Sequence, residues 1–256
     1  MIQVTPVPAF NDNYIWLITH NPGKHTAIVD PGDASPVLKR IEQEGLLPEA
    51  ILITHHHSDH VGGVTGLLRH FTIPVYGPER ESIPGRTHAL KGGDKLDLPA
   101  LSISFDILDV PGHTSGAIAY YGHGMVFVGD TLFMSGCGRL FEGTAAQMHH
   151  SLGRLAQLPD ETLVYCAHEY TLANLRFAQA VEPGNPDIKK RIRESESLRQ
   201  HNMPTVPGPL ALEKRTNPFL RVHLPEIVQT ASHYSGHPLR EETDVFAAVR
   251  QWKDSF

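Results

Sequence analysis

The pattern that most constrains the fold is a series of short apolar segments over the first 170 residues. The segments are rich in Ile, Val, Leu and Tyr, and Gly, Pro or Asp lies near most of their ends, which is typical of β-strands. Apolar residues at helical spacing predict helices between some of them, at residues 35–44 and 145–158. Strands mixed with helices on this scale indicate a layered α/β sandwich. We expect strands at residues 15–19, 26–30, 50–54, 74–76, 101–110, 117–121, 125–129 and 162–166.

The pattern changes in the last third of the chain, where strand signals largely stop. Residues 202–218 hold four prolines and are expected to form a long connection. We therefore place a boundary near residue 170, with an α/β domain over residues 1–170 and a small helical domain over residues 171–256. Helices are predicted in the second domain at residues 172–181, 186–201, 224–233 and 240–252.

Composition excludes several classes of protein. The chain has 22 Lys and Arg against 28 Asp and Glu, a net charge of −6, so a general nucleic-acid partner is not expected. No apolar run approaches the ~18 residues of a membrane span, and the first residues lack the features of a signal peptide. Two cysteines, Cys137 and Cys166, are too few for a disulfide framework. We expect a cytoplasmic protein without a membrane partner.

Histidine is the unusual residue type, with 17 copies, and four of them fall in the run THHHSDH at residues 54–60. This run follows an apolar strand, and α/β sheets place their sites at such strand ends. Alternate residues of an extended chain point the same way, so His55 and His57 can converge on one ion, while His56 points away and is replaceable. Asp59 and His60 fall where the chain turns into a helix and can face a second ion.

Three further strand ends carry ligand-type residues, namely His113, Asp130 and His168. Together the four segments offer five His and two Asp, enough for two three-ligand sites that share one bridging carboxylate. A single strand-end His is usually polar surface, and the run at 54–60 alone could be an adventitious or tag-like metal binder. Ligand-type residues at four separate strand ends argue against that interpretation.

These residues resemble the metallo-β-lactamase superfamily, whose T-H-x-H-x-D-H signature is complete at residues 54–60. The resemblance implies a four-layer αββα sandwich. It also implies a first metal held by His55, His57 and His113, a second held by Asp59, His60 and His168, and Asp130 as the bridge. Asp30, in the sequence VDPG, matches a position that supports the site without being a main ligand; a turn Asp before Pro-Gly explains it equally well.

Other segments are similar to the glyoxalase II (hydroxyacylglutathione hydrolase) family, namely GDTLF (129–133), CGR (137–139), AHEYT (167–171), NPFLR (217–221) and the chain end. In this family basic and aromatic residues hold glutathione. Arg139 stands where a Lys can occur, and Phe141 stands where a Tyr can occur, which removes a hydroxyl group. From spacing alone, Arg250 and Lys253 suit a solvated helix face, whereas the resemblance favours anion binding. The matching substrate-binding positions are Arg139, Phe141, Tyr170, Arg250 and Lys253.

The resemblance implies a thioester hydrolase that cleaves S-(2-hydroxyacyl)glutathione, chiefly S-D-lactoylglutathione, to glutathione and D-lactate in the second step of methylglyoxal detoxification. Two divalent ions, zinc or else iron or manganese, would share a bridging hydroxide that attacks the thioester carbonyl. Asp59 or Asp130 could orient this hydroxide, and neither cysteine is given a covalent role. The chain is expected to act as a monomer.

Other functions stay open at this point. A persulfide dioxygenase with one iron would share His55, His57, His113 and Asp130, but such proteins lack the long helical tail. A nuclease is disfavoured by the net charge and a β-lactamase by the missing signal peptide. A non-catalytic metal-binding protein would show no thioester hydrolysis that a chelator abolishes.

Overall fold

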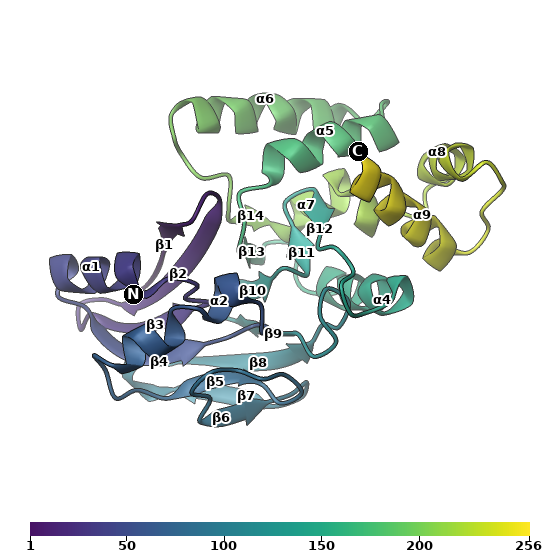
Figure 1. Cartoon of the computed structure of the whole chain (residues 1–256). Helices are drawn as coiled ribbons and strands as arrows, with labels where there is room; N and C mark the ends of the chain where they lie inside the picture. Colours follow the sequence, from purple (N-terminus) through teal and green to yellow (C-terminus); the bar gives the residue numbers. More distant parts are fainter. The chain divides into compact units, whose positions relative to one another are not determined.

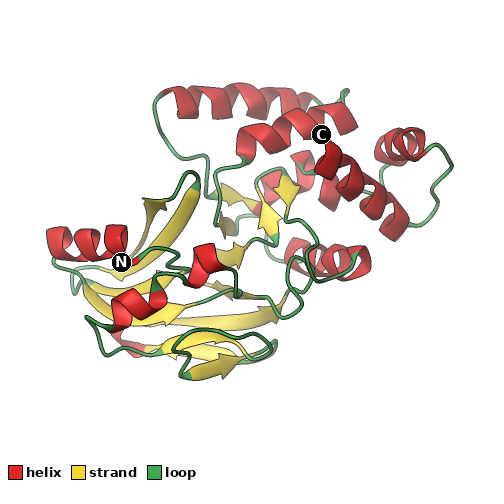
Figure 2. Cartoon of the chain, in the orientation of Figure 1, coloured by secondary structure: helices red, strands yellow, loops and turns green.

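The computed structural model of the protein describes all 256 residues. By packing, the chain divides into two compact units. The first unit comprises Met1–Asp109 and Gly116–Gly129, and the second comprises Val110–Ser115 and Asp130–Phe256. Strands dominate the first unit and helices the second (Figures 1 and 2). The expected α/β class with a helix-rich C-terminal part is confirmed.

The first unit contains a six-stranded sheet in the order of the chain. The first three strands pair with one another in antiparallel orientation, and from the third strand to the sixth every pairing is parallel. The strands are β1 (Ile2–Ala9), β2 (Asn13–His20), β3 (His25–Val29), β4 (Leu47–Leu52), β5 (Val75–Pro78) and β6 (His88–Leu90).

Three helices, α1 (Ala34–Glu44), α2 (Ser58–Val61) and α3 (Val64–Leu68), pack on one face of this sheet. Helix α1 begins where Asp33 caps it, since the Asp33 carboxylate accepts the amide of Ser35 at 2.9 Å. It ends at Gly45, whose φ of 61° is accessible to glycine at little cost. Between these ends, Val37 and Ile41 are buried against the strands, as their spacing predicts.

Four antiparallel strands of the first unit form the layer behind that sheet. In this layer the ring of Phe105 makes edge-to-face contacts with the rings of Tyr120, at 6.3 Å, and Phe127, at 6.0 Å. The Tyr120 hydroxyl donates to the Ile53 carbonyl at 2.8 Å, which ties this layer to the end of β4. The strands are β7 (Lys95–Leu98), β8 (Ile103–Asp109), β9 (Ile118–Gly122) and β10 (Met125–Gly129), with a 3₁₀ turn η1 (Pro99–Leu101) between the first two.

The second unit has two short antiparallel strand pairs and six α-helices. The pairs are β11 (Leu132–Phe133) with β12 (Gly136–Cys137), and β13 (Leu163–Cys166) with β14 (Gly208–Pro209). The helices are α4 (Ala145–Ala156), α5 (Thr171–Val181), α6 (Pro186–Gln200), α7 (Leu210–Thr216), α8 (Pro225–Ser235) and α9 (Glu242–Ser255), with a 3₁₀ turn η2 (Pro218–Leu220).

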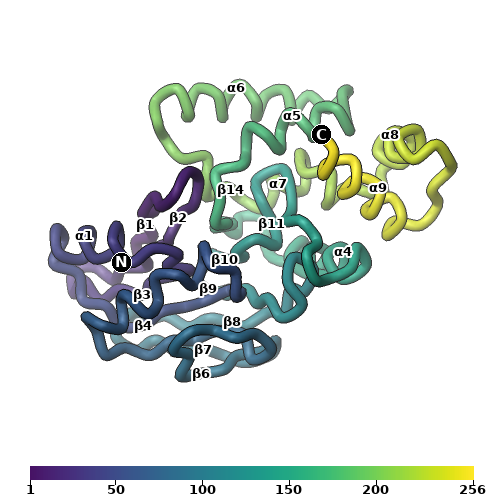
Figure 3. Tube along the Cα trace, in the orientation of Figure 1, coloured from purple at the N-terminus to yellow at the C-terminus, as the bar shows by residue number.

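Aromatic rings form much of the core of this helical unit. Phe177 of α5 contacts Phe219 and Trp252 at ring distances of 6.2 and 5.5 Å, and Phe219 contacts Phe246 at 5.5 Å. Helices α5 and α6 lie side by side along the chain trace (Figure 3), with Leu175 among the buried residues between them. These rings connect α5, η2 and α9 into one packed body.

The prediction of a long connection over residues 202–218 is wrong, because the structure places β14 and α7 there. Strands β1, β6, β7, β11 and β12 and helix α3 were also not expected. The other expected strands and helices are confirmed within a few residues of their ends. No helix has the length and the apolar composition that crossing a membrane requires.

Candidate metal centre and adjoining pocket

The loop after β4 supplies the first group of candidate ligands. His55 is 1% exposed and His60 is fully buried, although both are polar. Nε2 of His55 and Nδ1 of His57 lie 3.2 Å apart. Two nitrogens on one tetrahedral ion, each at 2.0–2.1 Å, would be separated by ~3.3 Å. The separation of this pair therefore suits two ligands of a single cation.

Asp30, at the end of β3, holds this loop in place. Its carboxylate accepts the backbone amide of Thr54 at 2.7 Å and the Thr54 hydroxyl at 2.6 Å. Nδ1 of His60 lies 3.1 Å from the same carboxylate. The backbone of Asp30 adopts a positive φ of 49°, which is uncommon for a residue other than glycine. Asp30 thus contacts Thr54, which precedes the first candidate ligand, and His60, which is itself a candidate ligand.

Hydrogen bonds at Nδ1 also decide which nitrogen of each ring can bind a metal. The Thr54 hydroxyl donates its only proton to Asp30, so Nδ1 of His55, at 3.1 Å from this hydroxyl, must donate to it. Nδ1 of His113 donates to the carbonyl of Arg139 at 2.8 Å. These contacts leave Nε2 of His55 and His113 with a lone pair for a cation.

In the second unit, Asp130 lies between two imidazoles. It follows β10, is 8% exposed, and its Oδ2 atom lies 3.4 Å from Nε2 of His113. The same oxygen lies 3.4 Å from Nε2 of His168, which follows β13. The same oxygen of Asp130 is therefore equally close to one member of each predicted ligand set, which is compatible with the predicted bridging role.

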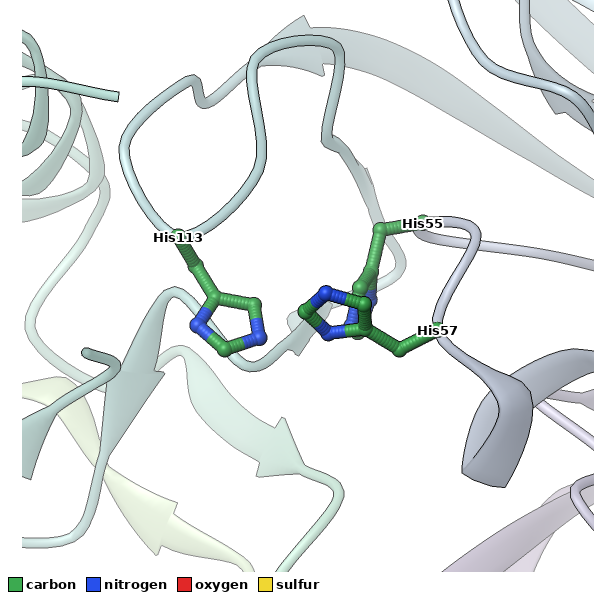
Figure 4. A group of neighbouring side chains, drawn as sticks. All are labelled: His55, His57 and His113. Atoms are coloured by element: carbon green, nitrogen blue, oxygen red, sulfur yellow. The ribbon is translucent and has the colours of Figure 1, made fainter. Parts of the chain in front are cut away.

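Four groups of three candidate ligands have their ligand atoms within 4.8 Å of one another, and two of these groups match the predicted ligand sets. One group is His55, His57 and His113, whose side chains point toward one another in Figure 4. The other is Asp59, His60 and His168. Both sets contain only imidazole nitrogens and carboxylate oxygens, which are suitable ligands for zinc, iron or manganese. The residues present therefore fit two divalent ions.

His56 is half-buried, and its ring lies 5.1 Å from that of His57. With His57 and Glu142 it also forms a candidate ligand group, in which the ligand atoms lie within 4.8 Å of one another. The expectation that His56 can be replaced without loss of metal stays a prediction.

A cavity of about 420 Å³ lies in the second unit. It is lined by all five residues that the sequence predicts for substrate binding, together with His113 and Asp130 among the candidate ligands. Four further residues of its wall, none of them predicted to bind substrate, are Phe133, Cys137, Ala173 and Asn174. Of these, Asn174 lies one helical turn after Tyr170, so helical spacing is the signal that could have identified it.

Three cationic side chains line this cavity. Arg250 is 5% exposed and donates to the Cys137 carbonyl at 2.7 Å and to Asp254 at 3.1 Å. Nε of Arg139 lies 3.5 Å from the same Asp254 carboxylate. Burial, followed by the charges of Arg250 and Arg139, lowers the pKa of Lys253. Three cations share one acidic partner here, which favours an anionic ligand.

The aromatic residues of the cavity differ in how firmly they are held. The Tyr170 ring stacks on His168, with centroids 4.7 Å apart and planes 6° apart. Phe141 is 64% exposed and touches the edge of His113 at 5.3 Å. A phenyl ring offers no hydrogen bond, so Phe141 can contribute only apolar contact.

Both cysteines are buried and unpaired in disulfides. Burial is the main cause that raises the pKa of Cys137 to about 11 and that of Cys166 to about 12. A thiolate is the nucleophilic form, so neither residue is suited to covalent catalysis near neutral pH.

The chain is similar to known proteins in both sequence and structure. Residues 9–168 match the model of the metallo-β-lactamase superfamily. The structure resembles that of ETHE1 from Myxococcus xanthus, with a TM-score of 0.65 and 25% identity over 100% of this chain and 99% of that chain. It also resembles TTHA1623 in a di-iron-bound form, with a TM-score of 0.60 and 29% identity over 84% of this chain and 100% of that chain. The predicted metallo-β-lactamase fold is confirmed.

The C-terminal part narrows the assignment. Residues 169–256 match the model described as hydroxyacylglutathione hydrolase C-terminus. A hydroxyacylglutathione hydrolase of Nitrosomonas eutropha is 57% identical over 256 residues, which is 100% of both chains. This chain belongs to the hydroxyacylglutathione hydrolase family of the metallo-β-lactamase superfamily.

Proposed function

We propose that the protein is a binuclear metallohydrolase that cleaves hydroxyacylglutathione thioesters. The substrate would be chiefly S-D-lactoylglutathione, and the products glutathione and D-lactate, which is the second step of methylglyoxal detoxification. The name of the relative from Nitrosomonas eutropha supports this substrate class. A thiolate is a good leaving group, so the reaction needs no strong general acid.

The observation that carries the proposal is the position of Asp130, with one oxygen 3.4 Å from Nε2 of both His113 and His168. In our assignment it bridges two ions. His55, His57 and His113 would hold the first ion, and Asp59, His60 and His168 the second. Asp30 would support the site through Thr54 and His60 without binding either ion.

When bound, two divalent ions supply a water of pKa near 7 and a Lewis acid for the thioester carbonyl. The protein contributes the positions of the groups around them. Asp59 or Asp130 would accept a hydrogen bond from the attacking water and orient it. Asp30 and the Arg139 carbonyl hold the rings of His60 and His113 in one tautomer and orientation.

We assign the cavity of the second unit to the glutathione moiety. Glutathione carries two carboxylates, and Arg139, Arg250 and Lys253 bring three cations to the cavity wall. Tyr170 adds a hydroxyl group and Phe141 an apolar surface. Because His113 and Asp130 line the same cavity, a glutathione thioester held there would have its carbonyl close to the candidate metal centre.

Zinc is the ion we propose first, with iron or manganese as alternatives, because the donor set accepts all three. The related TTHA1623 has been described in a di-iron-bound form. We also propose a catalytic domain over residues 1–170 and a substrate-binding helical domain over residues 171–256. The two family models meet close to this boundary, which supports it. We also propose that the protein acts as a monomer.

The test is metal analysis of purified protein alongside release of free thiol from S-D-lactoylglutathione. We expect two ions per chain and thiol release that stops when a chelator removes them. Protein with two ions and no thiol release would refute the proposal. Oxygen consumption with glutathione persulfide, in place of thioester hydrolysis, would indicate a dioxygenase.

A further inference from the structure

Asn13 lies far from the candidate ligands in sequence but touches one of them. It begins β2 after the tight turn of residues 10–12, in which Phe10 has a φ of 51°. Its side chain is 7% exposed. Its Nδ2 atom donates to Oδ2 of Asp59 at 3.0 Å, across 46 positions of sequence.

The backbone that carries Asp59 is already fixed from the other side. A Cβ atom on Gly32 would lie 1.9 Å from the Asp59 carbonyl oxygen, so only glycine lets this loop approach α2 so closely. The amide of Gly63, just after α2, donates to the carbonyl of Pro31 at 2.8 Å. With the backbone held, the orientation of the Asp59 side chain decides where its carboxylate lies.

This orientation matters because the Asp59 side chain is 39% exposed, in contrast to the buried imidazole of His60 beside it. The oxygen that Asn13 holds lies 3.5 Å from Nε2 of His60. The hydrogen bond therefore keeps the carboxylate next to the imidazole with which Asp59 forms a candidate ligand group.

The chemistry of the donor suits this task. An amide is neutral, so it orients the carboxylate without supplying a positive charge that would compete with a cation. A Lys or Arg at this place would form an ion pair and offset the charge that a metal needs. The amide thus restricts the geometry of Asp59 while its negative charge stays available.

We propose that Asn13 is a positioning residue that orients the Asp59 carboxylate for the second metal ion, an inference that rests on the binuclear centre of the proposed function. Strand β2 would then contribute to the site through a side chain that is not itself a ligand. The expected effect of losing it is about a 10–100-fold weaker affinity for one ion, the usual result for outer-shell partners of metal ligands.

The experiment compares Asn13→Ala with Asn11→Ala, an exposed asparagine in the adjoining turn. Stepwise zinc affinities are measured on the metal-free full chain by competition with a chromophoric chelator. Thermal unfolding of each metal-free variant checks the fold. We expect Asn13→Ala to weaken one binding step by about 10–100-fold and to leave the other unchanged. Asn11→Ala should alter neither.

If Asn13→Ala does not fold, Asn13→Leu keeps the side-chain volume without the donor and takes its place. Unchanged affinities in a folded variant, or equal weakening of both steps, would overturn the inference. Selective weakening of one step supports it even if the wild-type protein hydrolyses no thioester, so the two proposals can fail separately. Wild-type protein that binds a single ion would refute both.

Discussion

At the scale of single residues, the proposed function gives Asp130 the role of a bridge between the two candidate ions. Replacing it by Asn keeps the size of the side chain and removes the charge that would neutralise two cations. We expect Asp130→Asn to lose bound metal and at least about 100-fold in kcat/KM together. Metal content by elemental analysis and thioester hydrolysis measure the two effects. Full activity with two ions bound would rule out a bridging role.

Lys253 tests the assignment of the cavity without touching the metal ligands. Lys253→Ala should raise KM for the glutathione thioester about 10-fold and leave kcat and metal content close to wild type. Lys190→Ala is the matched control, since Lys190 belongs to the same unit but is solvent-exposed on α6. A KM that does not change in the first variant would remove Lys253 from substrate binding.

The lowered pKa of Lys253 predicts a pH effect. Burial favours the neutral amine, so its charge is lost below its ordinary pKa of 10.5, and affinity for the anionic substrate should fall as pH rises through the lowered value. Across the same window the unfolded chain binds more protons than the folded chain, so this group makes stability rise with pH. KM against alkaline pH, in wild type and Lys253→Ala, checks the expectation. An identical profile in both would contradict it.

The sequence predicts the residue types at the strand ends because metal binding needs imidazoles and carboxylates there. It does not predict Thr54 as the link between Asp30 and His55, nor Asn13 as the partner of Asp59. These contacts join residues up to 46 positions apart, and their chemistry is common to many polar surfaces. Only the folded chain distinguishes a hydrogen-bonded amide from an exposed one.

At the scale of elements, a buried ion pair ties two helices to the β11–β12 hairpin. Arg191 of α6 is 4% exposed and lies 2.5 Å from Glu213 of α7, which is fully buried. Glu213 also accepts the amide of Ser135 at 2.7 Å and the side chain of Asn217 at 3.0 Å. Ser135 lies in the loop of the hairpin, whose strands carry Phe133 and Cys137 to the cavity wall.

Breaking this pair from one side should be costly, because a buried charge is left without its partner. We expect Glu213→Ala to lower the free energy of unfolding by about 3–5 kcal/mol. Chemical denaturation measures the change. Glu194→Ala, at an exposed i, i+4 pair of α6, should cost less than about 1 kcal/mol. Equal effects of the two variants would show that the buried network does not hold these elements.

Pattern reasoning finds those elements whose own residues bury an apolar face, as in α1 and α4. It misses β1, where Pro6 and Pro8 interrupt the strand signal although an edge strand tolerates proline. It also misses α7, because prolines suggest a connection. In the structure, Pro209 immediately precedes this short helix and Pro218 opens the turn after it. Proline is favourable at such starts, so the same residues mark the boundaries of the helix.

At the scale of the whole molecule, metal and folding should be linked. Ions that bind only the folded chain stabilise it by mass action. We expect chelation to abolish thioester hydrolysis and to lower Tm, and excess zinc to restore both. Calorimetry of metal-free and reloaded protein gives the shift. An unchanged Tm would mean that the candidate ligands do not bind the ion in the folded protein.

The fold class and the family could be predicted from the sequence, because the signature at residues 54–60 and the motifs of the tail lie in contiguous segments. Which residues pack together in each of the two units could not be predicted from the sequence. Residues 110–115 pack with the second unit although their neighbours on both sides belong to the first. Sequence order does not reveal such an exchange, since it depends on which surfaces the folded segments meet.

The contacts between α9 and the cavity wall have a practical consequence. Arg250 of α9 donates to the Cys137 carbonyl, and Asp254, one helical turn later, lies within 3.5 Å of both Arg250 and Arg139. A carboxypeptidase that trimmed only residues 253–256 would remove one cation and the shared acid of the cavity. The trimmed protein would keep every candidate metal ligand but would bind the proposed glutathione thioester more weakly.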